Sequence, residues 1–350
     1  MLGCGVIGAS LARELNKSGM AVLVIERGEP GREASHAAAG MLAPHGGDLP
    51  GALGELAIAS AAMYPEFVRE LEDEAATRPH EPHAPSIDLR SQGTILIGDE
   101  QVEGARTLSR DEVAELEPQL ASSRISAKFI QENSVDPRGL MAALVRSLKH
   151  RGIELAHGTQ VTSVVRDQGG SFEVHTAKSK YLAGAVVNCC GAWAGKIEAH
   201  VAVPVKPRKG QMFSVIPRKT PFLQHVIRSE AFYLVPRSDG RILIGATVED
   251  RGFDKRVEPE VIKQLQNLAE RVVPEIAHSK IHETWAGLRP GTPDDLPILG
   301  ETIIPEYFIA TGHFRNGILL APVTAQIMSK LLRGEAAGYS VEAYSPSRFA

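Results

Sequence analysis

Apolar and polar positions at the start of the chain follow the pattern of a turn, a helix and a buried strand. Glycines cluster at the beginning, and apolar residues at 11, 12 and 15 then recur with helical spacing before Gly19, which suits a helix end. The apolar run 20–25 predicts a strand buried on both faces, and it closes on the acidic Glu26. This order is typical of the opening unit of a parallel α/β fold.

Helical periodicity returns in later segments. Ser109 and Glu112 form a capping-box pattern at the start of a short helix that ends before Pro118. Asp136 followed by Pro137 begins a helix that Gly152 ends. The other predicted helices are 55–75, interrupted near Pro65, then 257–272 and 317–332.

Short apolar or alternating runs predict strands along the rest of the chain. Three of them, at 153–156, 161–165 and 172–176, are close enough in sequence to form a meander. The apolar strand from 185 runs into a glycine turn and returns the chain to a buried parallel sheet, and residues 238–240 predict a hairpin turn. The other predicted strands are 92–98, 125–131, 211–215, 232–236, 241–247 and 307–312.

These elements predict an α/β fold with two interleaved parts. We expect a Rossmann-like dinucleotide-binding domain and a mostly antiparallel α+β substrate domain. The first comprises 1–80, 138–204 and 283–350, and the second comprises 81–137 and 205–282. The glycine turn of such a domain normally follows a buried strand, whereas Gly3 is two residues from the start. We therefore expect the first strand to be missing from this chain.

Composition and charge narrow the function without identifying it. A chain of 350 residues with a net charge of −4 and a pI near 6.3 buries a large core and presents no basic field for nucleic acid. It has no apolar run of membrane-spanning length and no signal-peptide pattern, so we expect a cytoplasmic protein. Three cysteines, two of them adjacent, are typical of reduced buried thiols. His80 and His83 lack further ligands at zinc spacing, so we expect no metal site.

Gly3, Gly5 and Gly8 form a G-x-G-x-x-G motif, whose glycines let the backbone approach a pyrophosphate. The N-terminus of the helix that follows offers free N–H groups and the positive end of its dipole. Glu26, at the end of the next strand, suits the hydroxyls of a ribose. The motif alone is weak because glycine turns are common, but the helix, strand and carboxylate at the expected distances favour a dinucleotide site.

No catalytic triad stands out, which points to a cofactor that carries the chemistry while the protein holds the substrate. Arg289 and Arg315 each lie in a glycine-rich turn, where a guanidinium either binds a substrate carboxylate or is simply a surface group. Tyr233 is either a substrate hydroxyl donor or a half-buried strand residue. The small residues of 34–45 either close a loop against a helix or lie along a flat cofactor ring. The residues alone leave these alternatives open.

Several motifs together resemble the FAD-dependent D-amino acid oxidase family, with the strongest resemblance to the glycine oxidases of thiamine biosynthesis. The resemblance covers essentially the whole chain in order, and its two arginine motifs are far more specific than the glycine motif. The motifs are the glycine start and segments 37–41, 233–241, 245–247, 285–292 and 312–322.

The resemblance implies a non-covalent FAD and assigns positions to it. Val6, Ile7, Glu26 and Arg27 would line the adenosine end, and Val161 would contact the adenine through its backbone. Further positions would contact the diphosphate and the flavin: Ala34, Ser35, Ala39, Gly40 and Met41. The run around the flavin ring would be His313, Phe314, Arg315, Asn316, Gly317, Ile318 and Leu319.

The same resemblance implies the reaction. Arg289 would bind the carboxylate of a small amino acid with help from the Tyr233 hydroxyl, and Arg315 would serve the amino-group side, largely through its backbone carbonyl. The Cα hydrogen would leave as hydride to the flavin, without a dedicated base. Molecular oxygen would then reoxidise the flavin and give hydrogen peroxide, while the imine is hydrolysed or passed to a thiazole-forming enzyme.

Departures from the family pattern leave the substrate open. Val248 stands where glycine oxidases can have a longer methionine, Ala231 and Phe232 precede Tyr233 in place of more polar residues, and adjacent Cys189 and Cys190 replace small ones.

The alternatives are a D-amino acid or sarcosine-type oxidase or dehydrogenase of the same family, or an inactive product truncated at the N-terminus. A nicotinamide-dependent dehydrogenase is disfavoured because a second cofactor motif, 313–319, lies far along the chain. The sequence leaves open whether the chain forms a homo-oligomer.

Overall fold

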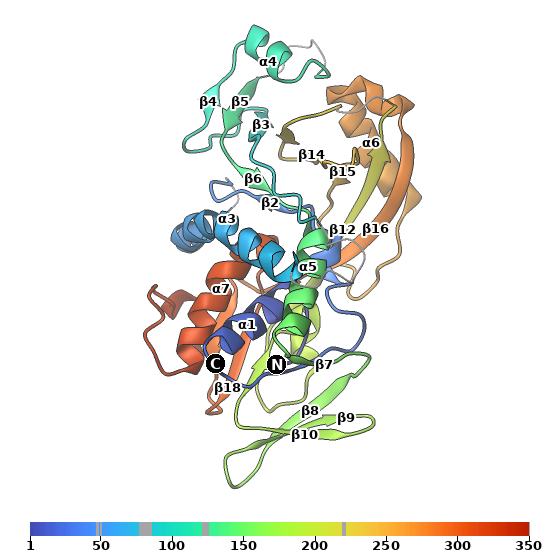
Figure 1. The fold of residues 1–350 in the computed structure, drawn as a ribbon. Coiled ribbons are helices and arrows are strands. Elements are labelled where there is room, and N and C mark those ends of the chain that lie inside the picture. Colours follow the sequence, from blue (N-terminus) through green and yellow to red (C-terminus); the bar gives the residue numbers. More distant parts are fainter. Residues whose placement is uncertain (47–48, 50, 77–85, 121–125, 219–221, 350) are drawn as a thin grey trace.

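Two β-sheets organise the chain in the computed structural model (Figure 1). The structure describes residues 1–46, 49, 51–76, 86–120, 126–218 and 222–349. Strands β8, β9 and β10 form one end of the molecule, strands β4 and β5 with helix α4 form the opposite end, and α1, α3, α5 and α7 lie between them. The predicted α/β class is confirmed.

The first sheet joins segments from the start, middle and end of the chain. Its parallel pairs are β1 with β7 and β11 with β18, and β17 is antiparallel to β18. The strands are β1 (Leu23–Ile25), β7 (Glu154–Ala156), β11 (Val186–Asn188), β17 (Ile298–Glu301) and β18 (Tyr307–Thr311).

Residues 1–3 lie between β1 and β11, where the first strand was expected to be missing. Leu2 forms parallel bridges with both Ile25 and Asn188. Its backbone N–H donates to the Val187 carbonyl, and the Ile25 N–H donates to the Met1 carbonyl, each at 2.9 Å. A single bridged residue therefore connects the two halves of this sheet.

The predicted meander is wrong in its first strand. β7 pairs with β1, and the antiparallel meander consists of β8, β9 and β10 instead. Sequence proximity favoured a local pairing, whereas the buried parallel sheet offered β7 a partner far away in the chain. The meander strands are β8 (Val161–Arg166), β9 (Phe172–Thr176) and β10 (Lys180–Ala183).

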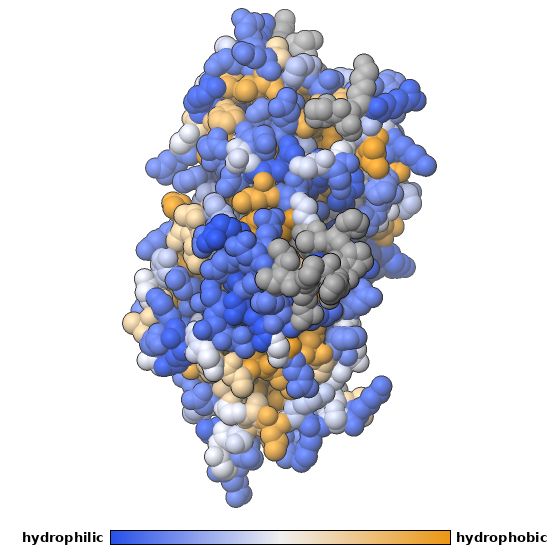
Figure 2. Space-filling view, in the orientation of Figure 1, coloured by the Kyte–Doolittle hydropathy of each residue, from blue (hydrophilic) through white to orange (hydrophobic). Residues whose placement is uncertain are grey.

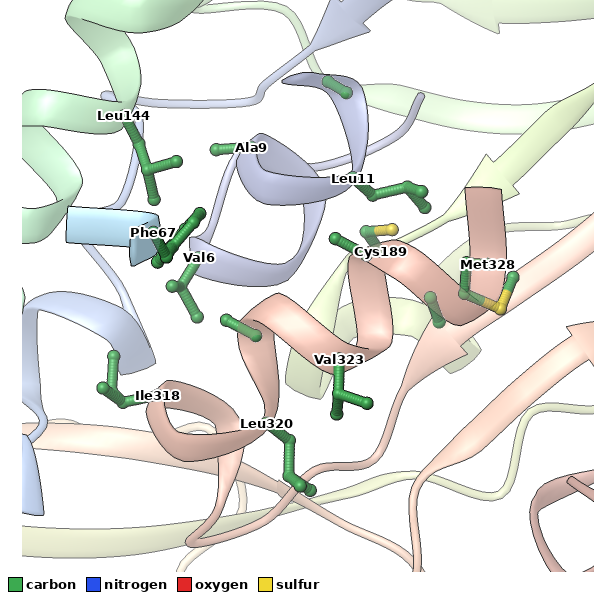
Figure 3. Close-up of a cluster of buried hydrophobic side chains, with 14 of the residues drawn as sticks. Val6, Ala9, Leu11, Phe67, Leu144, Cys189, Ile318, Leu320, Val323 and Met328 are labelled. Atoms are coloured by element: carbon green, nitrogen blue, oxygen red, sulfur yellow. The ribbon is translucent and has the colours of Figure 1, made fainter. Parts of the chain in front are cut away.

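Four helices build the main core against the first sheet. Figure 3 shows side chains of α1, α3, α5 and α7 meeting in one apolar cluster, among them Val6, Phe67, Leu144 and Val323. The expected interruption at Pro65 is wrong, because α3 continues through it while packing against α5 and α7. The helices are α1 (Val6–Lys17), α3 (Gly54–Ala76), α5 (Pro137–His150) and α7 (Gly317–Leu332).

Local signals account for the ends of these helices. Asp136 accepts a hydrogen bond from the Arg138 N–H at 2.9 Å, and Pro137 follows it in the first turn of α5. Gly19, just beyond α1, has a φ of +84°, a conformation that glycine adopts without strain. The predicted starts and stops of these two helices are confirmed.

The second sheet has eight strands and is antiparallel except for the pair β13 and β3, as predicted for a mostly antiparallel part. Its order is β16-β12-β15-β14-β13-β3-β5-β4. Helix α6 (Pro259–Val272) packs against it. The strands are β3 (Thr94–Ile97), β4 (Arg106–Thr107), β5 (Ala127–Ile130), β12 (Lys206–Ile216), β13 (Val226–Arg228), β14 (Tyr233–Pro236), β15 (Ile242–Gly245) and β16 (Lys280–Gly291).

Short elements lie between the larger ones. The capping box of α4 forms as predicted, with the Ser109 hydroxyl and the Glu112 side chain each bonding the other's backbone N–H. Strands β2 and β6 pair antiparallel beside the segment that leads from α2. These elements are α2 (Ala34–Ala37), α4 (Arg110–Leu116), β2 (Met41–Leu42) and β6 (Asn133–Ser134).

The surface is largely polar on the face shown in Figure 2, with apolar side chains in separate groups. Among the described residues, no helix is long and apolar enough to cross a membrane. No cluster of metal-binding side chains occurs in the same part of the chain. His80 and His83, like Ile125 at the start of a predicted strand, lie outside the described residues.

Candidate active site

A cavity of about 710 Å³ is lined by residues of both sheets. It brings together segments that are far apart in the sequence: the start of α1, the segment after α2, strands β14 and β16, and the start of α7. Of the site residues predicted above, Gly8 alone is not on its wall. Those on the wall are Gly3, Gly5, Val6, Ile7, Glu26, Arg27, Ala34, Ser35, Ala39, Gly40, Met41, Val161, Tyr233, Arg289, His313, Phe314, Arg315, Asn316, Gly317, Ile318 and Leu319.

Gly8 serves the site by close packing instead. A Cβ on Gly8 would lie 2.1 Å from the Gly3 carbonyl oxygen, and a Cβ on Gly3 would lie 2.7 Å from the Cys189 carbonyl oxygen. Gly3 also has a φ of +90°. The absence of these side chains lets the turn lie flat against β11, so that the N-terminus of α1 opens into the cavity.

Glu26 is held in place at one end of the cavity. Its Oε2 accepts from the Cys4 N–H at 2.8 Å, and its Oε1 accepts from the Gly28 N–H at 2.9 Å. Both bonds orient the carboxylate toward the glycine turn, in the arrangement that suits ribose hydroxyls.

Trp193 is a cavity residue that the sequence reasoning missed. The Arg27 guanidinium lies 3.6 Å above its ring centroid, and Arg27 also pairs with Glu33 at 2.5 Å. Trp193 follows β11, and ligands of such folds bind beyond the carboxyl ends of parallel strands. That position was the signal available in the sequence.

Two helix N-termini face the cavity and make it favourable for anions. Neither α1 nor α7 has an acidic residue in its first turn, and in α1 the Val6 N–H donates to the Ser35 hydroxyl at 2.9 Å. Gly317, Ile318 and Leu319, the first residues of α7, lie on the cavity wall. His313 beside them is neutral, because burial lowers its pKa to about 3, and its Nε2 lies 3.1 Å from the Thr324 hydroxyl.

The segment from His36 to Gly40 is fixed by donors from other elements. Trp285 Nε1 donates to the Ala37 carbonyl at 3.1 Å, Arg237 donates to the Ala39 carbonyl, and the Val135 N–H donates to the Gly40 carbonyl at 2.8 Å. None of these three donors belongs to a residue of the cavity wall. The carbonyls are therefore satisfied outside the cavity, which leaves small side chains along its wall.

Arg289 and Tyr233 line the part of the cavity formed by the second sheet. Arg289 Nη1 donates to the Thr247 carbonyl at 2.9 Å, and the Tyr233 hydroxyl lies 3.5 Å from the Met212 sulfur. Burial lowers the pKa of Arg289, but a neighbouring Tyr233 opposes that shift, and guanidinium pKa values start far above neutrality. Burial likewise raises the pKa of Tyr233, which stays a neutral hydroxyl.

Gly210 and Met212 are further wall residues that the sequence reasoning missed. They share one face of β12, and a Cβ on Gly210 would lie 2.2 Å from Arg289 Nη1. The available signal was their alternate spacing on a predicted strand.

These residues fit FAD. The glycine turn and Glu26 on the cavity wall suit a pyrophosphate and an adenosine, and the small residues of 37–40 on the same wall suit a flat ring. Its helix N-termini match the negative charge of the pyrophosphate. Arg289 then remains available for a carboxylate.

Comparisons with known proteins agree with this geometry. Residues 2–331 match the model of the DAO family, described as FAD dependent oxidoreductase. The chain is 33% identical over 364 residues to a glycine oxidase of Pseudomonas aeruginosa, and the match covers 99% of this chain and 98% of that protein. The crystal structure of glycine oxidase from Geobacillus kaustophilus matches with a TM-score of 0.92 and 31% identity, over 99% of this chain and 97% of that one.

A second group of relatives is longer. The chain is 35% identical over 359 residues to the Bifunctional protein ThiO/ThiG of Trichormus variabilis, and the match covers 100% of this chain but 54% of that protein. The chain thus spans about half the length of the bifunctional relatives that it matches. From the family match, the fold and the cavity together, the chain belongs to the DAO family of FAD-dependent oxidoreductases and is a glycine oxidase-like enzyme.

Proposed function

We propose that this enzyme oxidises glycine to its imine, which hydrolyses to glyoxylate and ammonia. The observation that carries the proposal is one cavity wall that holds Arg289 and Tyr233, from strands of the second sheet, together with the glycine turn and Glu26 of the first. Arg289 and Tyr233 can bind a carboxylate, and the small residues of the same wall leave space for a flat ring. This combination suits an amino acid held against the cofactor ring. The glycine oxidase relatives support the same reading.

The residues that would hold FAD are those of the cavity wall named above, from Val6 and Glu26 to the 313–319 segment. When bound, FAD supplies the acceptor for the hydride from Cα and passes the electrons to molecular oxygen, giving hydrogen peroxide. We propose a non-covalent cofactor. The thiols near the cavity support this, because burial raises the pKa of Cys4 and of Cys190 to about 12 and keeps both protonated.

The protein's own contribution is to bind and orient the substrate. Arg289 presents N–H groups to a carboxylate, the Tyr233 hydroxyl adds a further donor, and Arg315 lies on the same cavity wall near the amino group. Burial is the main cause that lowers the pKa of Arg289, and the charge of Arg315 lowers it further. The same positive field favours a neutral amine over an ammonium group, and a neutral amine is what loss of the Cα hydride requires. Positioning thus replaces a dedicated base.

We further propose the domain division given by the sequence, with 1–80, 138–204 and 283–350 holding the cofactor and 81–137 and 205–282 facing the substrate. The boundary between 282 and 283 falls within β16, and this strand pairs with β12 over its full length. The imine would feed thiazole formation in thiamine biosynthesis. The bifunctional ThiO/ThiG relatives support that assignment.

One observation favours a second candidate, a small D-amino acid or sarcosine-type substrate. Val248 is on the cavity wall, where its shorter side chain leaves more room than a methionine would. Both candidates undergo the same reaction, and they would differ only in the size of substrate that the pocket accepts.

A visible absorption spectrum of the purified protein, recorded before and after anaerobic addition of glycine, tests the proposal. A flavin spectrum that bleaches with glycine supports it. Flavin that stays oxidised with glycine but bleaches with D-alanine or sarcosine replaces it with the second candidate. A protein that binds no added FAD would contradict both.

A further inference from the structure

A cluster of polar and charged side chains, none of them on the cavity wall, lies next to the backbone that contacts Arg289. Its exposure is uneven, since the side chain of Glu258 is 41% exposed. We define the Lys209 cluster as Lys209, Gln211, Thr247, Glu249 and Glu258. The side chains of Lys209 and Gln211 are 0% exposed. Burying an ammonium group is costly unless it is paired and hydrogen-bonded, so the arrangement of its partners carries information.

The members of the cluster bind one another. Lys209 Nζ donates to Glu258 Oε1 at 3.0 Å and lies 4.0 Å from Glu249 Oε2. Gln211 Nε2 donates to Glu249 Oε1 at 3.0 Å, while Gln211 Oε1 accepts from the Glu258 N–H at 2.7 Å. One lysine and one amide thus hold two carboxylates from separate segments.

Thr247 connects the cluster to the substrate arginine. Its hydroxyl accepts from the Gln211 N–H at 3.0 Å and donates to Glu249. Its carbonyl accepts from Arg289 Nη1 at 2.9 Å. Arg289 is therefore oriented by a carbonyl whose own residue is held by Gln211 and Glu249.

The backbone shows why Thr247 needs this support. β15 pairs with β12 at Ile244 and Phe213, and the two segments meet again at Glu249 and Lys209. Between these two pairings the chain advances five residues from 244 to 249, whereas its partner covers only four, from 213 to 209. The segment 244–249 therefore carries one extra residue. Such a bulge redirects the backbone next to a site, and here it turns the Thr247 carbonyl toward Arg289.

Glu249 also acts on Arg289 through its charge. Burial and Arg315 lower the pKa of Arg289, whereas Tyr233 and Glu249 raise it, so Glu249 is a carboxylate that favours the charged guanidinium. Its side chain is 17% exposed. A buried ion pair is weak support for stability, since well-packed apolar residues often serve as well, which favours a role in positioning.

We propose that Glu249, held by Lys209 and Gln211, is a positioning residue for substrate binding: it fixes the Thr247 carbonyl and thereby the orientation of Arg289. This inference rests on the proposed function, because it takes Arg289 as the residue that binds the substrate carboxylate. Glu249 itself does not touch the substrate.

Two variants of Glu249 separate its contacts from its charge. Glu249→Ala removes both, whereas Glu249→Gln keeps the size and the hydrogen-bonding oxygen but removes the charge, and it serves as the second test should the alanine variant not fold. Asp250→Asn is the matched control. It removes the adjacent carboxylate, which is 70% exposed and contacts Arg208 rather than the cluster.

The measurements use the FAD-loaded enzyme. Steady-state kinetics give KM and kcat for glycine, and titration with glycolate, which keeps the carboxylate and lacks the amine, gives a Kd from the change in flavin absorbance without turnover. We expect Glu249→Ala to raise both KM and this Kd about tenfold with kcat within about twofold, Glu249→Gln to raise them less, and Asp250→Asn to leave them unchanged.

If wild type binds glycolate and the Glu249 variants bind it equally well, the inference is overturned but the proposed function is not. A parallel loss of kcat, glycolate binding and FAD affinity also overturns it, since that pattern marks a structural role. Wild-type enzyme that neither binds glycolate nor is reduced by glycine overturns the proposed function and the inference with it.

Discussion

Among single residues, two glycines shape the space around Arg289 as much as the arginine itself does. Gly210 leaves room for the guanidinium, and Gly245 lets Tyr233 and Met212 approach each other, since a Cβ there would lie 2.8 Å from Met212 Cγ and 3.0 Å from Tyr233 Cε2. Two glycines on neighbouring strands thus shape the space into which Arg289 and Tyr233 extend.

Arg289→Ala is expected to raise KM for glycine by about 100-fold or more, because removing one partner of a buried, hydrogen-bonded charge pair costs about 3 kcal/mol. FAD should remain bound, since Arg289 is on β16 of the second sheet, whereas the glycine turn and Glu26 belong to the first sheet. Steady-state kinetics and the flavin spectrum of the purified variant measure the two effects. Loss of flavin would show that Arg289 is structural.

Val248→Met is expected to narrow the cavity wall and to lower kcat/KM for D-alanine relative to glycine about tenfold, the discrimination that one misplaced methyl-sized group produces in a pocket. The ratio of the two kcat/KM values, measured in wild type and variant, provides the test. An unchanged ratio would remove Val248 from the substrate pocket.

At the scale of elements, one buried ion network joins α1, α3 and α5. Arg13 of α1 donates to Glu74 of α3 at 2.7 and 3.1 Å and to Ser147 of α5 at 3.0 Å. Arg151, just after α5, donates to the same carboxylate at 3.0 Å. The network sets the spacing of the helices that carry the cofactor-facing turn.

Burial raises the pKa of Glu74, but hydrogen bonds from Arg13, Arg151 and Ser147 outweigh it and lower the pKa from 4.5 to about 2. A carboxyl whose pKa is depressed by folding adds stability above its unfolded pKa, and that stability is lost as the pH falls from about 4.5 toward about 2. Glu74→Gln should cost about 3 kcal/mol at pH 7.

Urea unfolding of wild type and Glu74→Gln as a function of pH measures this contribution. The difference in the free energy of unfolding should be largest near neutrality and should shrink below pH 4.5. A difference that stays constant down to pH 3 would assign the effect to packing rather than to charge.

At the scale of the whole molecule, the cavity is a joint product of two sheets. The segment with the small side chains leaves α2 of the first part and is held by Trp285 of β16 and by Arg237 after β14. A second link runs from Lys255 to Glu33 at 2.9 Å, and the rings of Phe253 and Trp193 lie tilted against each other with their centroids 5.3 Å apart. A ligand that fills the cavity therefore contacts both parts at once.

Bound FAD should accordingly stabilise the entire chain. At a free FAD concentration 100 times its Kd, the gain is about 2.7 kcal/mol, which corresponds to a rise of about 4 °C in Tm for a protein of this size. Thermal unfolding of the enzyme stripped of flavin, with and without added FAD, gives the shift, and adenosine alone provides a control that reaches one end of the cavity. An unchanged Tm would contradict FAD binding in this cavity.

The local elements could be predicted from the sequence alone. Helical spacing ends at Gly19, Asp136 and Pro137 begin a helix, and Ser109 with Glu112 caps another, because capping and periodicity depend on neighbours within a few residues. The sequence also favoured a dinucleotide cofactor, since the glycine motif and Glu26 lie at a characteristic spacing along one short segment, while FAD itself followed only from the resemblance to the family.

The contacts between distant segments could not be predicted from local patterns and are seen only in the tertiary structure. The pairing of β7 with β1, the place of Trp193 on the cavity wall and the contact of Thr247 with Arg289 each join residues whose local patterns would be the same with other partners. The Lys209 cluster is the clearest case, because its charged and polar residues would be ordinary surface groups in a different arrangement of strands. Periodicity records that one face of an element is buried, whereas long-range packing determines what that face is buried against.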